Sequence, residues 1–70
     1  MNKERFYEIF YAYKKRECTT LDLKELLEAY IYDRCGKSIT INSLSMIHDS
    51  ARTNSMIQYA FDFYNEKFSQ

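Results

Sequence analysis

The side chains able to carry out chemistry in this chain are few: one histidine, His48, and two cysteines, Cys18 and Cys35. A metal site needs three or four converging His, Cys or carboxylate ligands. A Cys–His nucleophile pair needs a third group to orient it and a device that stabilises an oxyanion. His48 beside Asp49, with two distant cysteines, supplies neither set. We therefore expect no metal, no cofactor and no catalytic residue, with His48 as an ordinary surface or half-buried side chain.

Two other kinds of chemical site also lack their residues. Glu25 and Glu28 lie one helical turn apart, and we interpret them as charges that solvate a helix face rather than as an acid–base pair. Gly36 is the one glycine of the chain, so a glycine-rich phosphate-binding loop is excluded. The sequence predicts a protein that is not an enzyme.

The length and the charge of the chain set further bounds. Seventy residues can bury one core, so we expect residues 1–70 to form a single domain. Ten basic residues balance ten acidic ones, whereas a protein that holds DNA mainly through phosphates usually has a basic face. The one basic cluster, formed by Lys14, Lys15 and Arg16, is followed at once by Glu17. Autonomous DNA binding is therefore disfavoured.

The sequence favours the cytoplasm as the location of the protein. It contains no run of about 18 apolar residues that would span a membrane, and its first residues lack the apolar stretch of a secretory signal. Cys18 and Cys35 do not have the CxxC spacing, so we expect both to be reduced, partly buried thiols.

Aromatic side chains are the feature that exceeds the needs of a small core. The chain holds seven tyrosines and five phenylalanines, and each ring can bury about 150–250 Å². Tyr7 and Tyr11 lie four residues apart, off the apolar stripe of one helix, and Tyr59 and Phe63 repeat this spacing on another. Paired exposed rings are typical of protein interfaces. We predict that these four rings contact a partner protein, either a second copy or another protein, and that the basic cluster tunes the electrostatics.

Helices must position these rings. Apolar residues recur at i, i+3, i+4 and i+7 in residues 3–16, with Asn2 as the N-cap. The same pattern runs from Thr20, a predicted N-cap, to Gly36, a predicted C-terminal cap. Residues 38–42 alternate polar and apolar, which we interpret as an extended approach to a further helix. Whether residues 43–68 form one helix, or two with a turn near 50–53, stays open.

These patterns predict an all-α fold, a compact bundle of three or four short helices. The predicted core consists of Phe6, Phe10, Leu26, Leu27, Ile31, Leu44, Ile47, Ile57, Phe61 and Tyr64. So small a core leaves little net stability, and association with a partner would add to it.

Direct DNA binding is the alternative function. Residues 43–49, a turn at 50–53 and residues 54–68 would form a helix-turn-helix that presents Arg52 to a groove. However, Asp62 and Glu66 make the candidate recognition helix acidic, and the turn lacks its usual glycine. Contact with nucleic acid is therefore the second interpretation.

The order of these features resembles the Hha/YmoA family of small enterobacterial expression modulators. Residues 16–22 read Arg-Glu-Cys-Thr-Thr-Leu-Asp, similar to the family segment Arg-x-Cys-Thr-Thr-Ile-Asp that leads into its second helix. Leu44, Ser50-Ala51 and Tyr64 keep the family's later spacings. Residues 51–54 depart from the family, since Ala-Arg-Thr-Asn stands where it has Ala-Asp-His-Arg, and the closing Pro…Val-Trp segment is missing.

The resemblance implies a helical protein that pairs with the dimerisation region of an H-NS-type nucleoid protein and modulates silencing without reading DNA itself. It also makes Arg52 a partner-contact position at which the family's acidic charge is reversed, so the particular partner would differ. An inhibitor of one host protein, encoded by a phage or plasmid, accounts for the same features. We therefore expect a small regulator of transcription that acts through protein contacts.

Overall fold

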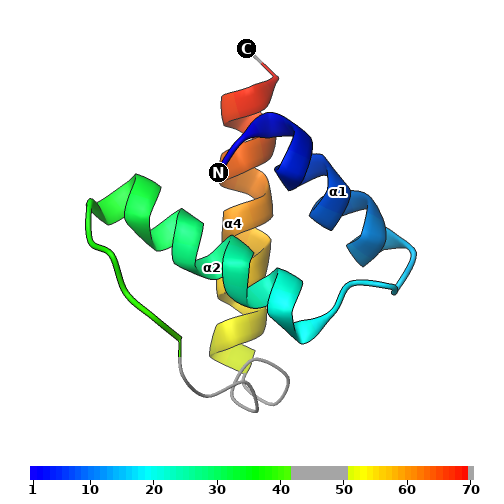
Figure 1. Cartoon of the computed structure of the whole chain (residues 1–70), viewed down its shortest axis with the longest axis horizontal. Helices are drawn as coiled ribbons and strands as arrows, with labels where there is room; N and C mark the ends of the chain where they lie inside the picture. The colour runs from blue at the N-terminus through cyan, green and yellow to red at the C-terminus, as the bar shows by residue number, and fades with distance from the viewer. Residues whose placement is uncertain (42–50, 70) are drawn as a thin grey trace.

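The computed structural model of the chain describes residues 1–41 and 51–69, with the backbone alone for 51–53. The described helices are α1 (Lys3–Lys14), α2 (Thr20–Cys35) and α4 (Ala51–Phe68), and each contacts the other two. In Figure 1, α2 crosses α4 and extends to the left, and α1 lies to the right of the upper half of α4. This is the predicted all-α architecture of short helices.

The two ends of α1 are closed in different ways. Asn2 is the N-cap, as predicted, and its side-chain oxygen accepts the backbone N–H of Arg5 at 2.7 Å. At the C-terminal end Arg16 adopts a φ of 59°. The N–H of Arg16 donates to the carbonyl of Tyr13 at 3.1 Å, and the N–H of Glu17 donates to that of Ala12 at 2.8 Å. These paired bonds form a Schellman motif, in which the left-handed residue is usually glycine.

The N-cap of α2 is Thr19, so the prediction of Thr20 is wrong by one residue. The Thr19 hydroxyl accepts the N–H of Asp22 at 3.1 Å, and the Asp22 carboxylate accepts the N–H of Thr19 at 3.3 Å. This capping box needs a polar acceptor three residues after the cap, and a cap at Thr20 would place Leu23 there. Gly36 ends α2 with a φ of 71°, as predicted.

The core lies where the three described helices meet. Its buried residues are Phe6, Ile9, Leu23, Leu26, Leu27, Tyr30, Ile57, Ala60, Phe61 and Tyr64. This confirms most of the predicted core. Phe10 and Ile31 were predicted to be buried but are half-buried, because they pack against the rim of this cluster rather than inside it. Leu44 and Ile47 lie outside the described residues.

Asp33, near the end of α2, interacts with residues at both ends of the described chain. Its carboxylate accepts a hydrogen bond from the hydroxyl of the buried Tyr64 at 2.5 Å. The same carboxylate lies 3.5 Å from the amino group of Met1 and 3.9 Å from Nζ of Lys67. Burial alone would raise the pKa of Asp33, but the bond from Tyr64 and the two positive charges hold it below its usual value. Burial, and then the bond to Asp33, raise the pKa of Tyr64. The phenol therefore stays protonated as the donor.

Arg5 joins α1 to α2. Its Nε donates to Glu25 Oε2 at 2.7 Å and its Nη2 to Glu25 Oε1 at 3.2 Å, while Nη2 also donates to Asp22 Oδ1 at 2.9 Å. Glu25, followed by Asp22, raises the pKa of Arg5 above its usual value. The interpretation of Glu25 as a solvating charge is therefore wrong, since it pairs across two helices.

Glu28 also has a structural partner, so its interpretation as a solvating charge is wrong as well. Its Oε1 accepts a hydrogen bond from the backbone N–H of Ile41 at 2.7 Å and thereby holds Ile41 against α2. Residues 38–41 form neither a helix nor a strand, and the extended approach predicted for residues 38–42 stays a prediction.

The polar residues 51–55 belong to α4, which is helical from Ala51. The turn predicted at 50–53 for a helix-turn-helix is therefore wrong from residue 51 onward, because this stretch contains neither proline nor glycine to interrupt a helix. The helix predicted at 43–49, with His48, and its connection to α4 lie outside the described residues.

Two further predictions concern the surface. Cys18 and Cys35 are both free thiols, as expected, but only Cys18 is half-buried and Cys35 is exposed. Cys35 is the last residue of α2, where little of the chain covers it. Within the described residues, no helix has both the length and the apolar character that a bilayer crossing requires.

Candidate functional site

A group of three contacting rings lies on the surface of α1. The rings of Tyr7 and Tyr11 are stacked, with centroids 5.8 Å apart and planes at 24°. The ring of Phe10 lies 5.7 Å from that of Tyr11 and 6.3 Å from that of Tyr7. Tyr11 is 55% exposed, and the other two are half-buried. We call Tyr7, Phe10 and Tyr11 the α1 aromatic patch.

The core holds this patch in place from below. The ring of Phe6, which is fully buried, lies 5.2 Å from Tyr7 and 5.7 Å from Phe10. Phe10 also lies 5.4 Å from Phe61 on α4. Rings fixed in this way lose little conformational freedom when they bind, so more of their contact energy goes into affinity. The predicted pairing of Tyr7 with Tyr11 is confirmed, and Phe10, which was predicted to be in the core, joins it.

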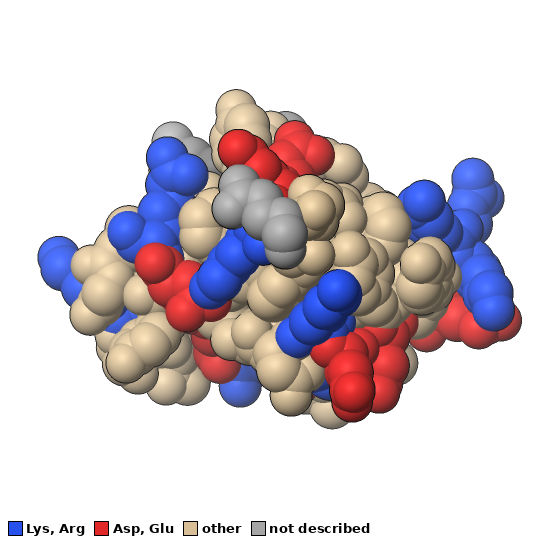
Figure 2. Space-filling view, turned by 90° about the horizontal axis from the view of Figure 1, so that it is seen from above, with Lys and Arg blue, Asp and Glu red and all other residues tan. Residues whose placement is uncertain are grey.

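The predicted basic patch borders this surface. Nζ of Lys14 lies 4.4 Å from the centroid of the Phe10 ring. Lys15 and Arg16 are exposed, and no ion pair joins any of the three bases to a described acidic side chain. In Figure 2, blue side chains gather at the right-hand edge, which is the α1 end of the molecule, with red side chains below them. Other blue side chains lie across the rest of this face, where they alternate with red ones.

The other two predicted contact residues lie in a different place. Tyr59 and Phe63 line a groove of about 340 Å³ between α2 and α4. We call this the α2–α4 groove; its lining residues are Tyr30, Arg34, Tyr59, Asp62, Phe63 and Glu66. Tyr59 is 62% exposed, while Phe63 is half-buried and packs edge-on against Tyr30 with ring centroids 5.5 Å apart.

The four predicted contact rings therefore form two surfaces. On α4, Phe61 faces α1 and contacts Phe10, and Phe63 lies about 200° further round the helix, where it contacts Tyr30 of α2. Tyr59 and Phe63 line the same groove but, among the described rings, do not stack on one another as Tyr7 and Tyr11 do. Sequence spacing predicted which residues share a helix face but not how the helices separate the faces.

Arg52 was also predicted to contact a partner. It lies in the first turn of α4, and its side chain falls outside the described residues. Its role stays a prediction.

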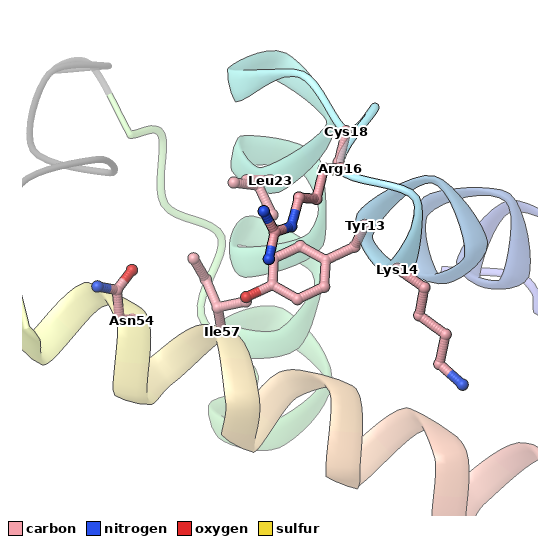
Figure 3. Close-up of a pocket in the computed structure, with 7 residues that line it drawn as sticks. All are labelled: Tyr13, Lys14, Arg16, Cys18, Leu23, Asn54 and Ile57. Carbon is pink, nitrogen blue, oxygen red and sulfur yellow. The ribbon is translucent and has the colours of Figure 1, made fainter.

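A larger cavity, of about 560 Å³, lies where the end of α1 meets α2 and α4 (Figure 3). The Tyr13 ring projects from α1 toward α4, where its hydroxyl accepts a hydrogen bond from Nε2 of Gln58 at 3.3 Å. Lys14 points away from the other lining residues. Burial, and then the charge of Asp22, raise the pKa of the Cys18 thiol in this cavity. Because the protonated thiol is a weak nucleophile, Cys18 is suited to packing.

No group of three His, Cys, Asp or Glu side chains that would hold a metal ion occurs within residues 1–41 and 51–69. Comparison of the chain with protein-family models, curated protein sequences and solved structures gave no significant match. The resemblance to the Hha/YmoA family thus rests on its motif residues and stays a prediction, as does the expectation that the chain is not an enzyme.

Proposed function

We propose that the chain is a small non-enzymatic regulatory protein that binds another protein through the α1 aromatic patch. One observation carries the proposal: three rings in mutual contact lie at the surface of α1, and the core below fixes them. Because Tyr11 remains 55% exposed, much of its apolar ring is still available for burial in a complex.

Charge supports a protein partner over a nucleic acid. Base stacking on exposed rings works beside a cationic groove that follows the phosphates. Within the described residues, Lys14 is the one base placed over a ring of the patch, and the chain carries no net charge. A short basic cluster beside three rings, with no cationic groove along them, matches an apolar protein surface with acidic groups at its edge.

The regulatory part of the proposal comes from the resemblance in residues 16–22 and its later spacings. In its most specific form the partner is a nucleoid protein in the cytoplasm, and the chain modulates silencing. If the chain is instead an inhibitor encoded by a phage or plasmid, its partner is one host protein, which would bind the same aromatic patch. Direct DNA binding is the alternative, and the test below separates it from protein binding.

The proposal is tested by affinity purification of the tagged chain from its native host, with and without nuclease. Three forms are compared: the unmodified chain, Tyr7→Ala with Tyr11→Ala, and Tyr32→Ala. Tyr32 is a matched control because its ring is 58% exposed, close to that of Tyr11, but lies on α2. Thermal unfolding shows that each variant is folded.

We expect a partner protein that survives nuclease treatment, binds the Tyr32→Ala variant as well as the unmodified chain, and is lost from the double variant. A partner that disappears with nuclease would instead support DNA binding. Equal retention by all three forms would show that the α1 aromatic patch is not the contact surface.

A further inference from the structure

We infer that the α2–α4 groove is a second binding site, which takes the arginine or lysine side chain of a basic segment of a partner protein. The inference rests on the proposed role in protein binding but uses a surface apart from the α1 aromatic patch. The two proposals can therefore fail separately.

Aromatic rings form the apolar part of the groove. Tyr30 is only 8% exposed, Phe63 packs edge-on against it with the planes at 69°, and Tyr59 stands largely in solvent. The face of an aromatic ring carries partial negative charge and attracts cations within about 6 Å of its centre. Bases of the chain itself lie at two of these rings, since Cζ of Arg34 is 5.9 Å from the centroid of Tyr30 and Nζ of Lys67 is 6.0 Å from that of Phe63. Among the described contacts, Tyr59 is the lining ring that has no cation beside it.

Carboxylates form the other part. Asp62 and Glu66 lie one turn apart on α4, so both project from the same side of the helix. Both are exposed, and neither forms an ion pair with a described basic side chain. The neighbouring base Lys67 lies 3.9 Å from Asp33, which leaves Arg34 as the one base among the lining residues. The lining thus holds two acids against one base.

An arginine or lysine side chain fits both parts of the groove. Its aliphatic stem covers apolar surface while its charged tip reaches polar groups, so the stem would cover Tyr59 and the tip would reach Asp62 and Glu66. A purely apolar side chain would remove water from the two carboxylates without giving them a partner. An acidic segment would meet charges of its own sign. Arginine should bind more tightly than lysine, because its planar guanidinium stacks on rings and bonds carboxylates in pairs.

The chain carries exposed bases of its own at the end of α1, Lys14, Lys15 and Arg16. A second copy could therefore present a basic segment to the groove. However, Lys14 already lies over the Phe10 ring, and the acidic Glu17 directly follows Arg16. We therefore assign the groove to a different protein, and self-association through the groove is an outcome that would overturn the assignment.

The test is a titration of the full ¹⁵N-labelled chain, followed by NMR, with a short acetylated and amidated peptide of alternating arginine and alanine. We expect saturable shifts centred on Tyr59, Asp62, Phe63 and Glu66. Asp62→Asn with Glu66→Gln should weaken binding at least about tenfold, a loss of about 1.4 kcal/mol. The matched control is Glu4→Gln with Glu17→Gln, which makes the same change in net charge at exposed acids elsewhere. It should leave the affinity within about twofold, because distant exposed charges are screened.

A second peptide, with citrulline in place of arginine, keeps the shape of the side chain and removes its charge. We expect it to cause no saturable shifts. Equal binding of the citrulline peptide, equal weakening by both double variants, shifts that spare the groove, or groove shifts that grow with protein concentration alone would each overturn the assignment. Tyr7→Ala with Tyr11→Ala should leave the peptide affinity unchanged, so failure of the α1 proposal does not affect this result.

Discussion

Arg16 and Tyr64 show what single residues contribute to this small fold. Arg16 closes α1 in a left-handed conformation that glycine usually adopts, in a chain that has one glycine in total. Tyr64 is a fully buried ring whose polar tip needs a partner, and Asp33 provides it at 2.5 Å. The left-handed backbone of Arg16 and the hydrogen bond of Tyr64 each depend on a single residue, so one substitution tests each of them.

At Arg16, glycine should stabilise the protein. A side chain at positive φ meets steric repulsion that glycine avoids, so we expect Arg16→Gly to raise the free energy of unfolding by about 1 kcal/mol. Lys15→Gly removes the same charge at a φ of −86°, where glycine relieves no strain, and should lower stability. Urea unfolding of the two variants measures both effects, and a less stable Arg16→Gly would contradict the account of this helix end.

The Tyr64–Asp33 bond should make stability depend on acid pH. The pKa of Asp33 is lower in the folded state than the unfolded value of about 3.9. The stabilisation is therefore complete above about pH 4 to 5 and is lost as the pH falls through the folded-state pKa. We expect Tyr64→Phe to cost about 1–3 kcal/mol at pH 7, and less once the pH falls below the folded-state pKa of Asp33.

Thermal unfolding of Tyr64→Phe at neutral and acid pH checks this expectation. The control is Tyr32→Phe, which removes a hydroxyl from an exposed ring on α2. Parallel pH profiles for the unmodified chain and Tyr64→Phe would show that the bond to Asp33 does not set the acid response.

At the scale of helices, local sequence rules predicted most of what the structure shows. Asn2 and Gly36 were predicted as caps because both signals need only a few adjacent residues. Two adjacent threonines made the start of α2 ambiguous, and the reciprocal bond with Asp22 selects Thr19. The pairing of Arg5 with Glu25 spans 20 residues, so it depends on how α1 packs on α2, which helical periodicity does not specify.

The Arg5 network should contribute measurably to the packing of α1 on α2. Exposed single ion pairs contribute little to stability. Arg5, however, donates two hydrogen bonds to Glu25 and one each to Asp22 and Glu8, and these bonds form a network. We expect Arg5→Gln to lower stability by about 1 kcal/mol at low salt and by less at about 1 M salt, where charges are screened.

Urea unfolding at the two salt concentrations measures the contribution of Arg5. Lys3→Gln is the control, since Lys3 is an exposed base on the same helix without an ion pair to a described acid. A loss of stability equal to that of the control, or one that salt leaves unchanged, would contradict an electrostatic link between the helices.

At the scale of the whole molecule, the packing of the described helices separates the four predicted contact rings into two places. The sequence predicted that more rings exist than the core encloses, and Tyr11, Tyr32 and Tyr59 are indeed largely exposed. It did not predict that Tyr7 and Tyr11 stack beside Phe10, which contacts Phe61 on one side of α4, while Phe63 packs against α2 on another side. That division depends on which face of α4 each neighbour covers, which only the tertiary arrangement determines.

The most direct test of the central claim is site-specific photo-crosslinking in the native host, with p-benzoylphenylalanine in place of Tyr11 or, in a separate variant, of Tyr32. The two rings are 55% and 58% exposed and lie on different helices, so accessibility alone gives the same yield at both. We predict a defined protein adduct from position 11 and none from position 32. No adduct at position 11, or the same adducts at both positions, would contradict a protein-binding role for the α1 aromatic patch.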